Sequence, residues 1–272
     1  MNFKTLFSIA ALSLPLLSHA ETTNSDALNP LKPLNNVRIS MQRMLSSQEG
    51  RYFLNLYAGI AKPHAVLYDQ LNKTSTQFKG SQKADQIVMD AVSDGGEKFI
   101  PQQLTGSLNV NSGIFKSSLV DLNNQSSTSI QFEPAFKVAN KPLFTFKFYG
   151  VKADTPTQEQ LLTRVDVINK TNNTVAQTLT GFSAFPNSIG YMDINFDGYY
   201  DVILSDLSQD RKLQDRRYIY WMFNPKTGQF QRSPQMEKLV GLPKLHGETK
   251  QIDYGDGVIF QVENGLLNRL DQ

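Results

Sequence analysis

The sequence contains no cysteine among its 272 residues, and it has only three histidines and one tryptophan. The absence of cysteine excludes disulfides, thiol nucleophiles, cysteine-ligated zinc and iron–sulfur clusters. An excess of charge of one sign is also lacking: 27 Lys and Arg face 25 Asp and Glu, so no basic surface for nucleic acid is indicated. The apolar share of 40% still allows a sizeable core. Any chemistry must therefore rest on oxygen and very few nitrogen ligands.

Long apolar runs are missing too, apart from a stretch at the start of the chain, Leu6–Leu17. Lys4 precedes this stretch, and the small residues Ser18 and Ala20 follow it, which is typical of a secretory signal peptide. The stretch is too short for a transmembrane helix, which needs about 20 apolar residues. We therefore predict a signal peptide over residues 1–20, cleaved after Ala20. The mature protein is expected in the periplasm, with secretion as the alternative and no membrane insertion.

Residues 21–50 are predicted to form a flexible leader. The segment up to about Asn36 is polar, carries Pro30 and Pro33 and shows no periodicity. The remaining part, Val37–Ser47, could form either a short helix or a short strand.

Beyond the leader, short apolar or alternating segments are separated by Gly, Asn, Ser or Pro clusters, which is typical of strands. In Leu143–Val151, three phenylalanines alternate with Thr, Lys and Tyr, so one face of that strand should be buried. The same criteria predict further strands at Tyr52–Ala58, His64–Tyr68, Gln86–Val92, Ile114–Val120, Ser129–Phe132, Arg164–Ile168, Thr174–Leu179, Ile189–Asp193, Val202–Leu204, Tyr218–Phe223, Gln229–Gln231, Thr249–Tyr254 and Val258–Glu263.

These strands predict an all-β, antiparallel fold of short strands, arranged as a sandwich, a barrel or a propeller. Periodicity alone does not choose among the three. The length suits a single all-β domain over residues 51–272, with a subdivision near residue 150 left open.

One short helix is predicted at residues 155–162. Thr155 can cap its start, Pro156 suits the first helical position, and Gln158 can close a capping box. The strand expected from Arg164 onward limits the helix to about two turns.

One segment of the sequence carries recognisable chemistry, because acidic and amide residues alternate in it as they do in calcium-binding loops. Gly198 occupies position 6, where such loops bend sharply, but position 12 is Leu204 and not the Glu of an EF-hand. Positions 1, 3, 5, 7 and 9 provide the predicted ligands, with residue 7 contributing its backbone carbonyl: Asp193, Asn195, Asp197, Tyr199 and Asp201.

The alternative interpretation of this segment is a polar turn in which Asp and Asn side chains bond to their own backbone. Three carboxylates within nine residues would, however, repel one another without a cation. Calcium suits such a loop better than magnesium, which dehydrates reluctantly. We therefore predict Ca²⁺ as a cofactor with a structural role.

The turn and the strand that follows it resemble a family of Gram-negative periplasmic proteins. Arg164–Phe230 carries the resemblance, above all the turn Asp193–Asp201, the aromatic strand from Tyr218 and the sequence Asn-Pro-Lys-Thr-Gly that ends at Gly228. This family is related to the periplasmic inhibitors of invertebrate-type lysozyme and includes immunity proteins against lysozyme-like effectors of secretion systems. The resemblance implies a β-propeller-like fold, calcium at the turn and function by inhibition.

The resemblance also implies a loop that enters the catalytic groove of a lysozyme-like partner. The nearest loop in this chain is Thr180–Pro186, which lacks the Tyr of the family loop. A groove built around two carboxylates is blocked best by hydrogen-bond donors and cations. Together, loop position and chemistry nominate five partner-binding candidates: Ser183, Phe185, Arg216, Arg217 and His246.

An enzyme is not predicted. After removal of the signal peptide only His64 and His246 are left as candidate bases, and neither belongs to a His-Glu-x-x-His zinc motif. Gly181–Phe185 lacks the second glycine of a nucleophile elbow. A pair of catalytic carboxylates stays open, but nothing marks one. Two functions remain: inhibition of a lysozyme-like peptidoglycan glycoside hydrolase, and a calcium-stabilised propeller module for adhesion or polysaccharide binding.

Overall fold

The computed structural model describes residues 31–35, 37–59, 62–93, 100–155, 158–208 and 210–270. The predicted signal peptide lies outside these residues, as does most of the first part of the leader. The prediction of an all-β protein is confirmed, because regular structure in the described ranges consists of strands and two short 3₁₀ turns, η2 (Leu213–Asp215) and η3 (Met236–Lys238). None of the described residues forms a helix long and apolar enough to cross a membrane.

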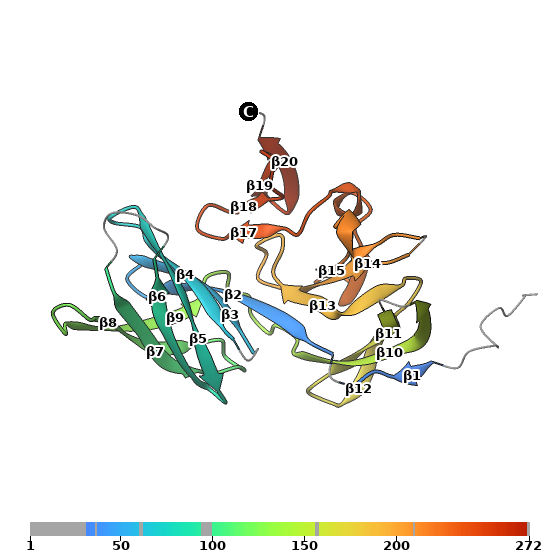
Figure 1. Cartoon of the computed structure of the whole chain (residues 1–272), viewed down its shortest axis with the longest axis horizontal. Coiled ribbons are helices and arrows are strands. Elements are labelled where there is room, and N and C mark those ends of the chain that lie inside the picture. Colours follow the sequence, from blue (N-terminus) through green and yellow to red (C-terminus); the bar gives the residue numbers. More distant parts are fainter. Residues whose placement is uncertain are drawn as a thin grey trace, which may run out of the picture. The chain divides into compact units, whose positions relative to one another are not determined.

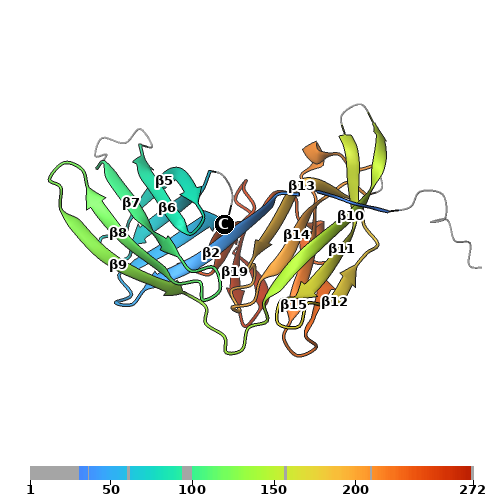
Figure 2. The same ribbon diagram turned by 90° about the horizontal axis from the view of Figure 1, so that it is seen from below.

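Eight consecutive antiparallel strands form a closed barrel, which is the blue-to-green part of the ribbon in Figures 1 and 2. Each strand pairs with the next, and the last returns to the first through Leu45 opposite Pro134 and Ser47 opposite Phe132. The strands are β2 (Ile39–Ser47), β3 (Tyr52–Ala58), β4 (His64–Asp69), β5 (Thr74–Lys83), β6 (Gln86–Val92), β7 (Gln102–Leu108), β8 (Phe115–Asp121) and β9 (Ser127–Pro134).

Side chains fill the barrel interior, following the two-residue period of each strand. In β6, Ile87 and Met89 are buried inside, whereas Val88 and Asp90 face outward. Strand β3 departs from this pattern because both of its faces are covered. Its Leu54 belongs to the core inside the barrel, while Phe53 on the other face joins a separate core outside it.

The second part of the sheet is built on β2, which pairs in parallel with β13 through Ile189 opposite Ile39 and Tyr191 opposite Met41. Strand β2 therefore belongs both to the barrel and to this second group. The strands of this second group pair antiparallel with one another and are β1 (Lys32–Pro33), β10 (Phe144–Thr155), β11 (Gln158–Asn169), β12 (Thr174–Leu179), β13 (Ala184–Met192), β14 (Asp201–Asp206), β15 (Tyr218–Asn224) and β16 (Gln229–Arg232).

Two predictions of local structure need correction. The leader was expected to extend to residue 50, but β2 places residues 39–47 in the barrel, because they pair with both β3 and β9. The helix predicted at residues 155–162 is wrong: Thr155 ends β10 and Gln158 begins β11, and the two residues face each other across a hairpin. Pairing along this hairpin outweighs the weak local signal of a helix cap.

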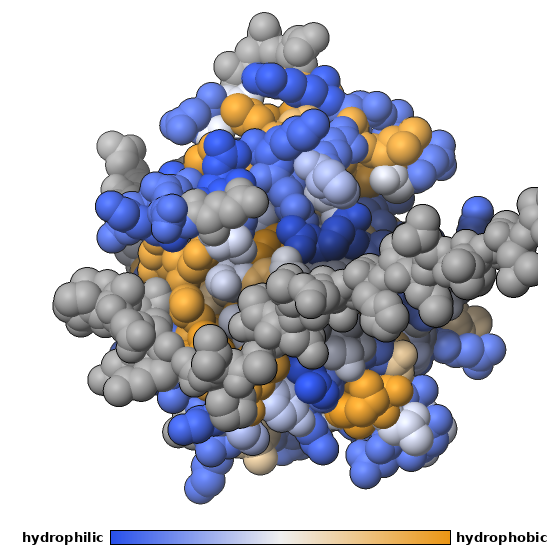
Figure 3. All heavy atoms as spheres, turned by 90° about the vertical axis from the view of Figure 1, so that its right-hand side faces the viewer, coloured by the Kyte–Doolittle hydropathy of each residue, from blue (hydrophilic) through white to orange (hydrophobic). Residues whose placement is uncertain are grey.

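A separate meander of four strands ends the chain and packs on the outer side of the barrel and the second group (Figure 1). The second group has its own core, with Leu162, Val165 and Leu204 among its residues. The core that Phe53 of β3 joins outside the barrel is the third core; it also includes Ile203 from β14 and Ile252 from the meander, and it holds these parts together. On the face shown in Figure 3, apolar residues surface in separate groups among hydrophilic ones. The strands of the meander are β17 (Lys244–His246), β18 (Gln251–Asp253), β19 (Ile259–Glu263) and β20 (Leu266–Leu270).

Candidate calcium turn and an adjoining cavity

The predicted calcium loop is the connection between β13 and β14, which pair through Met192 opposite Asp201. Its conformation is fixed from the apolar side, because Ile194 and Phe196 alternate with the polar residues and are buried in the third core. Gly198 has a φ of +91°, and a Cβ there would lie 2.8 Å from Cγ1 of Val138. Only glycine fits this position, in agreement with its expected place at the bend of the loop.

The aspartate side chains of the turn accept hydrogen bonds from the backbone of the turn itself, as expected for the alternative interpretation, a polar turn. Asp193 accepts the backbone N–H of Asp197 at 3.0 Å and that of Gly198 at 2.9 Å. Asp197 in turn accepts the backbone N–H of Tyr199 at 2.9 Å. Within the described parts of the chain, no group of three or more Asp, Glu or His side chains is arranged to hold a metal ion. The turn is therefore preformed by its own backbone, with its carboxylates turned toward amides.

Asp201 connects the turn to the sheet. Its side chain is fully buried and accepts the backbone N–H of Ile194 at 2.9 Å and that of Phe223, in β15, at 2.8 Å. Burial, followed by the charge of Asp193, raises the pKa of Asp201 well above its ordinary value. One buried carboxylate thus ties the turn and β14, on which it lies, to β15.

Two observations indicate that the turn suits a hard cation. The Oδ1 atom of Asn195, at the predicted third ligand position, is buried and has no hydrogen-bond partner among the described residues. Burial and the neighbouring Asp197 raise the pKa of Asp193 to about 7, so ionising this carboxyl in the metal-free turn is costly. A cation would pair with that charge and with the free oxygen of Asn195.

Lys141 is a cation beside the turn, where it interacts with the charges of its three aspartates. Its Nζ lies 3.4 Å from the centroid of the Tyr200 ring. Burial lowers the pKa of Lys141 to about 8, although the negative charges of Asp193, Asp201 and Asp197 oppose that change. Lys141 therefore balances only part of the acidic charge.

The raised pKa of Asp193 predicts a pH-dependent response to calcium. Below its ordinary pKa of 3.8 the carboxyl is protonated in both the folded and the unfolded chain, so it costs nothing. Between 3.8 and about 7 the unfolded chain ionises first, and the metal-free protein should lose stability as the pH rises. Calcium should therefore raise the melting temperature more at about pH 8 than at about pH 5.

Differential scanning fluorimetry with excess chelator and with millimolar calcium, at both pH values, measures this response. The calcium-saturated protein serves as the control for all other titrating groups. An equal calcium effect at the two pH values, or none at either, would contradict the assignment of Asp193 as a ligand.

Four of the five predicted partner-binding residues lie at one end of the β13–β14–β15 sheet. The carbonyl of Ser183 accepts the N–H of Leu207 at 2.8 Å, and the carbonyl of Arg217 accepts the N–H of Asp206 at 2.9 Å. Phe185 follows on β13, half-buried. Arg216, with an αL backbone, caps η2 and is exposed. We refer to this group, Ser183, Phe185, Arg216 and Arg217, as the arginine edge.

His246 does not belong to the arginine edge. It lies on β17, half-buried, with its Nδ1 atom 3.2 Å from a carboxylate oxygen of Glu248. The next residue, Gly247, packs so closely that a Cβ there would lie 2.6 Å from Sδ of Met44 and from the ring of Phe53. His246 thus belongs to the junction between the meander and the barrel.

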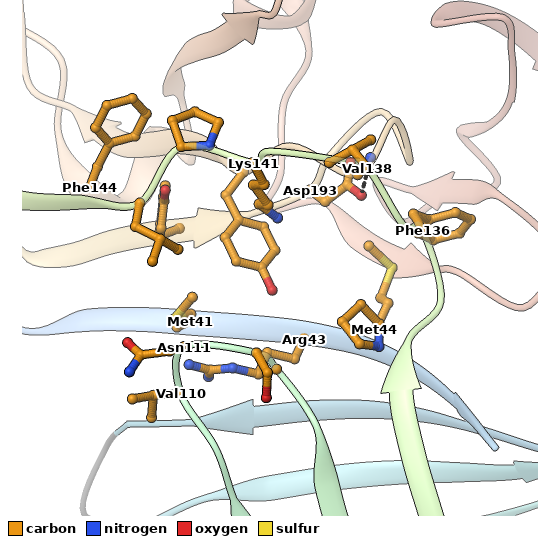
Figure 4. Close-up of a pocket in the computed structure, with 18 of the residues that line it drawn as sticks. Met41, Arg43, Met44, Val110, Asn111, Phe136, Val138, Lys141, Phe144 and Asp193 are labelled. Carbon is orange, nitrogen blue, oxygen red and sulfur yellow. Dashed lines mark hydrogen bonds between the residues drawn. The ribbon is translucent and has the colours of Figure 1, made fainter. Parts of the chain in front are cut away.

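Sequence reasoning missed a cavity of about 930 Å³ beside the calcium turn. Strand β2, the 109–114 loop, the 135–143 crossing segment, the start of β10 and residues of the turn line it. Figure 4 shows Arg43 and Met41 on strand β2 at one side of this space, and Lys141 and Asp193 at the other. The lining residues come from distant parts of the sequence, so no local motif could have indicated them.

No protein-family model matches the sequence, and the search of curated proteins finds no match either. The functional assignment therefore depends on the residues themselves, namely the predicted calcium turn, the arginine edge and the cavity.

Proposed function

We propose that the protein is a periplasmic calcium-binding inhibitor of a lysozyme-like peptidoglycan glycoside hydrolase, and not an enzyme. The observation that carries the proposal is the arginine edge, where Arg216 and Arg217, just before β15, lie at the same end of the sheet as Ser183 and the half-buried Phe185 of β13. These groups offer cations, hydroxyl and apolar contact at one place. Lysozyme-like hydrolases have two carboxylates in their groove, and such groups pair well with guanidinium donors.

The arginine edge is held in position by the structure beneath it. Arg217 donates from Nη1 to the carbonyl of Lys238 at 2.6 Å, which fixes the direction of its side chain. Arg216 is exposed, and none of the described carboxylates forms an ion pair with it. It is thus available to a partner's carboxylate. In this proposal, calcium stabilises the β13–β14 turn, which lies at the opposite end of these strands from the arginine edge, and does not touch the partner.

Inhibition is tested by turbidity assays on cell walls with a panel of lysozymes and lysozyme-like effectors. The purified protein should inhibit at least one of them and form a complex with it. Truncating one partner of a buried charge pair costs about 2–5 kcal/mol. The double variant Arg216→Ala/Arg217→Ala should therefore raise the inhibition constant at least tenfold with little change in melting temperature.

Lys226→Ala is the matched control, because Lys226 is an exposed cation on the hairpin between β15 and β16. It should inhibit as well as the unmodified protein. Absence of inhibition and of complex formation with every hydrolase of the panel would overturn the proposal.

The alternative function, a propeller module for adhesion or polysaccharide binding, has less support. Propellers repeat four-stranded blades, whereas residues 39–134 close into a barrel. The calcium sequence also occurs in full only once.

A further inference from the structure

The cavity beside β2 contains a buried cation that the protein does not neutralise. Arg43 is only 5% exposed, and its Nη1 atom has no hydrogen-bond partner among the described residues. No carboxylate in the described ranges forms an ion pair with it. An uncompensated buried charge is costly, so its retention indicates a partner that comes from outside the chain.

The acidic groups around the cavity do not neutralise the positive charge of Arg43, because they are bonded to other groups. Lys137 and Glu133 pair with each other, with Nζ 2.5 Å from the carboxylate oxygen. Asp193 uses both carboxylate oxygens to accept backbone N–H groups of the turn. Lys141 adds a second cation across from Arg43 (Figure 4). The polar end of the cavity is therefore suited to an anion.

Most of the remaining wall is apolar and comes from both sides of the cavity. The cavity's volume of about 930 Å³ is large for a simple anion. It falls within the range of about 300–1,000 Å³ that is typical of small-molecule sites. The main apolar contributors are Met41, Met44, Val110, Phe136, Val138 and Phe144. The barrel interior, in contrast, is filled with apolar side chains.

We propose that this cavity binds a single-chain anionic amphiphile, with a carboxylate or phosphate head on Arg43 and an acyl or alkyl chain along the apolar wall. The guanidinium fork of Arg43 matches both heads, because each presents two oxygens to parallel N–H donors. Lys141 supplies a second positive charge to the anionic head. Burial of the chain supplies most of the affinity, and the head fixes the orientation.

Isothermal titration calorimetry tests this proposal with decanoate, decyl phosphate, decanol and acetate, all at one fixed calcium concentration. Decanoate, decyl phosphate or both should bind, and decanol and acetate should bind at least tenfold more weakly. The two charged probes distinguish a carboxylate ligand from a phosphate ligand. Binding of neither, or equal binding of decanol, would overturn the proposal.

Arg43→Met identifies the residue responsible. It should lower the affinity for the charged probe at least tenfold, since charge-assisted hydrogen bonds are lost, while raising the melting temperature of the ligand-free protein because an unpaired buried charge is removed. Arg38→Gln is the control, because Arg38 is exposed just before β2 and does not line the cavity.

Lys141→Gln provides a second variant should Arg43→Met fail to fold, and it should weaken binding of the charged probe several-fold. Unchanged affinity in Arg43→Met, or in Lys141→Gln where only that variant folds, would contradict the assigned position of the head group.

Discussion

Gly80→Ala is expected to destabilise the protein by about 3 kcal/mol or to prevent folding. Overpacking substitutions usually cost about 1–3 kcal/mol, and the cost is highest where the added group meets backbone atoms that cannot move aside. Gly80 lies in β5 opposite Met89 of β6. A Cβ at this position would lie 1.9 Å from the carbonyl oxygen of Val88 and 2.6 Å from the Cα of Met89. Both are backbone atoms of the neighbouring strand, so accommodating the methyl group requires that β5 and β6 separate.

The position of this glycine explains why the barrel can close. Gly106, in β7, meets β8 in the same way, with a Cβ there only 2.4 Å from the carbonyl oxygen of Lys116. Strands that must bend to close a barrel use glycine where two backbones approach closely. Gly80 and Gly106 therefore mark two places where the sheet curves.

Urea unfolding of Gly80→Ala beside Ser81→Ala measures the effect. Ser81 is the exposed neighbour on the same strand, and its replacement should change stability by no more than about 0.5 kcal/mol. Equal midpoints for the two variants would show that β5 has room for a side chain and that the curvature has another origin.

Many of the strands could be predicted because their segments show an apolar or alternating residue pattern of their own. The ranges Tyr52–Ala58, Gln86–Val92 and Thr174–Leu179 coincide with β3, β6 and β12. In each, apolar or alternating residues end at a polar turn, so the strand can be recognised without its partner. Strand β5 was missed because Thr74–Lys83 is polar throughout, apart from Phe78 and Gly80, and only its neighbours reveal it.

The features that define the candidate sites depend on non-local pairing. Strand β2 pairs with β3, β9 and β13, and this junction forms one side of the cavity. A single arginine in the mixed apolar and polar segment Ile39–Ser47 gives no sequence signal, so Arg43 could not be recognised. The turn at Asp193 could be predicted, since its ligand-type residues are close in sequence. Their backbone hydrogen bonds, however, could be seen only in three dimensions.

Replacing Asp201 by alanine is expected to destabilise the protein by about 3 kcal/mol even in the absence of calcium. The substitution leaves the backbone N–H groups of Ile194 and Phe223 without acceptors. Each buried orphaned donor costs about 1–3 kcal/mol, and the removal of a buried charge offsets part of that sum. Asp201→Asn should lie between the alanine variant and the unmodified protein, because its amide keeps one acceptor but places a donor against the second N–H.

Asn195→Ala separates the ligand role of the turn from its structural role. Asn195 donates to Asp197 at 3.0 Å, but its buried Oδ1 accepts no hydrogen bond from any described residue. In chelator this variant should therefore lose less than about 1 kcal/mol of stability, whereas the rise in melting temperature on adding calcium should largely disappear. Asp201→Ala should be less stable both with and without calcium. If Asn195→Ala keeps the full calcium response, the turn is a backbone-bonded hairpin connection and any calcium binds elsewhere.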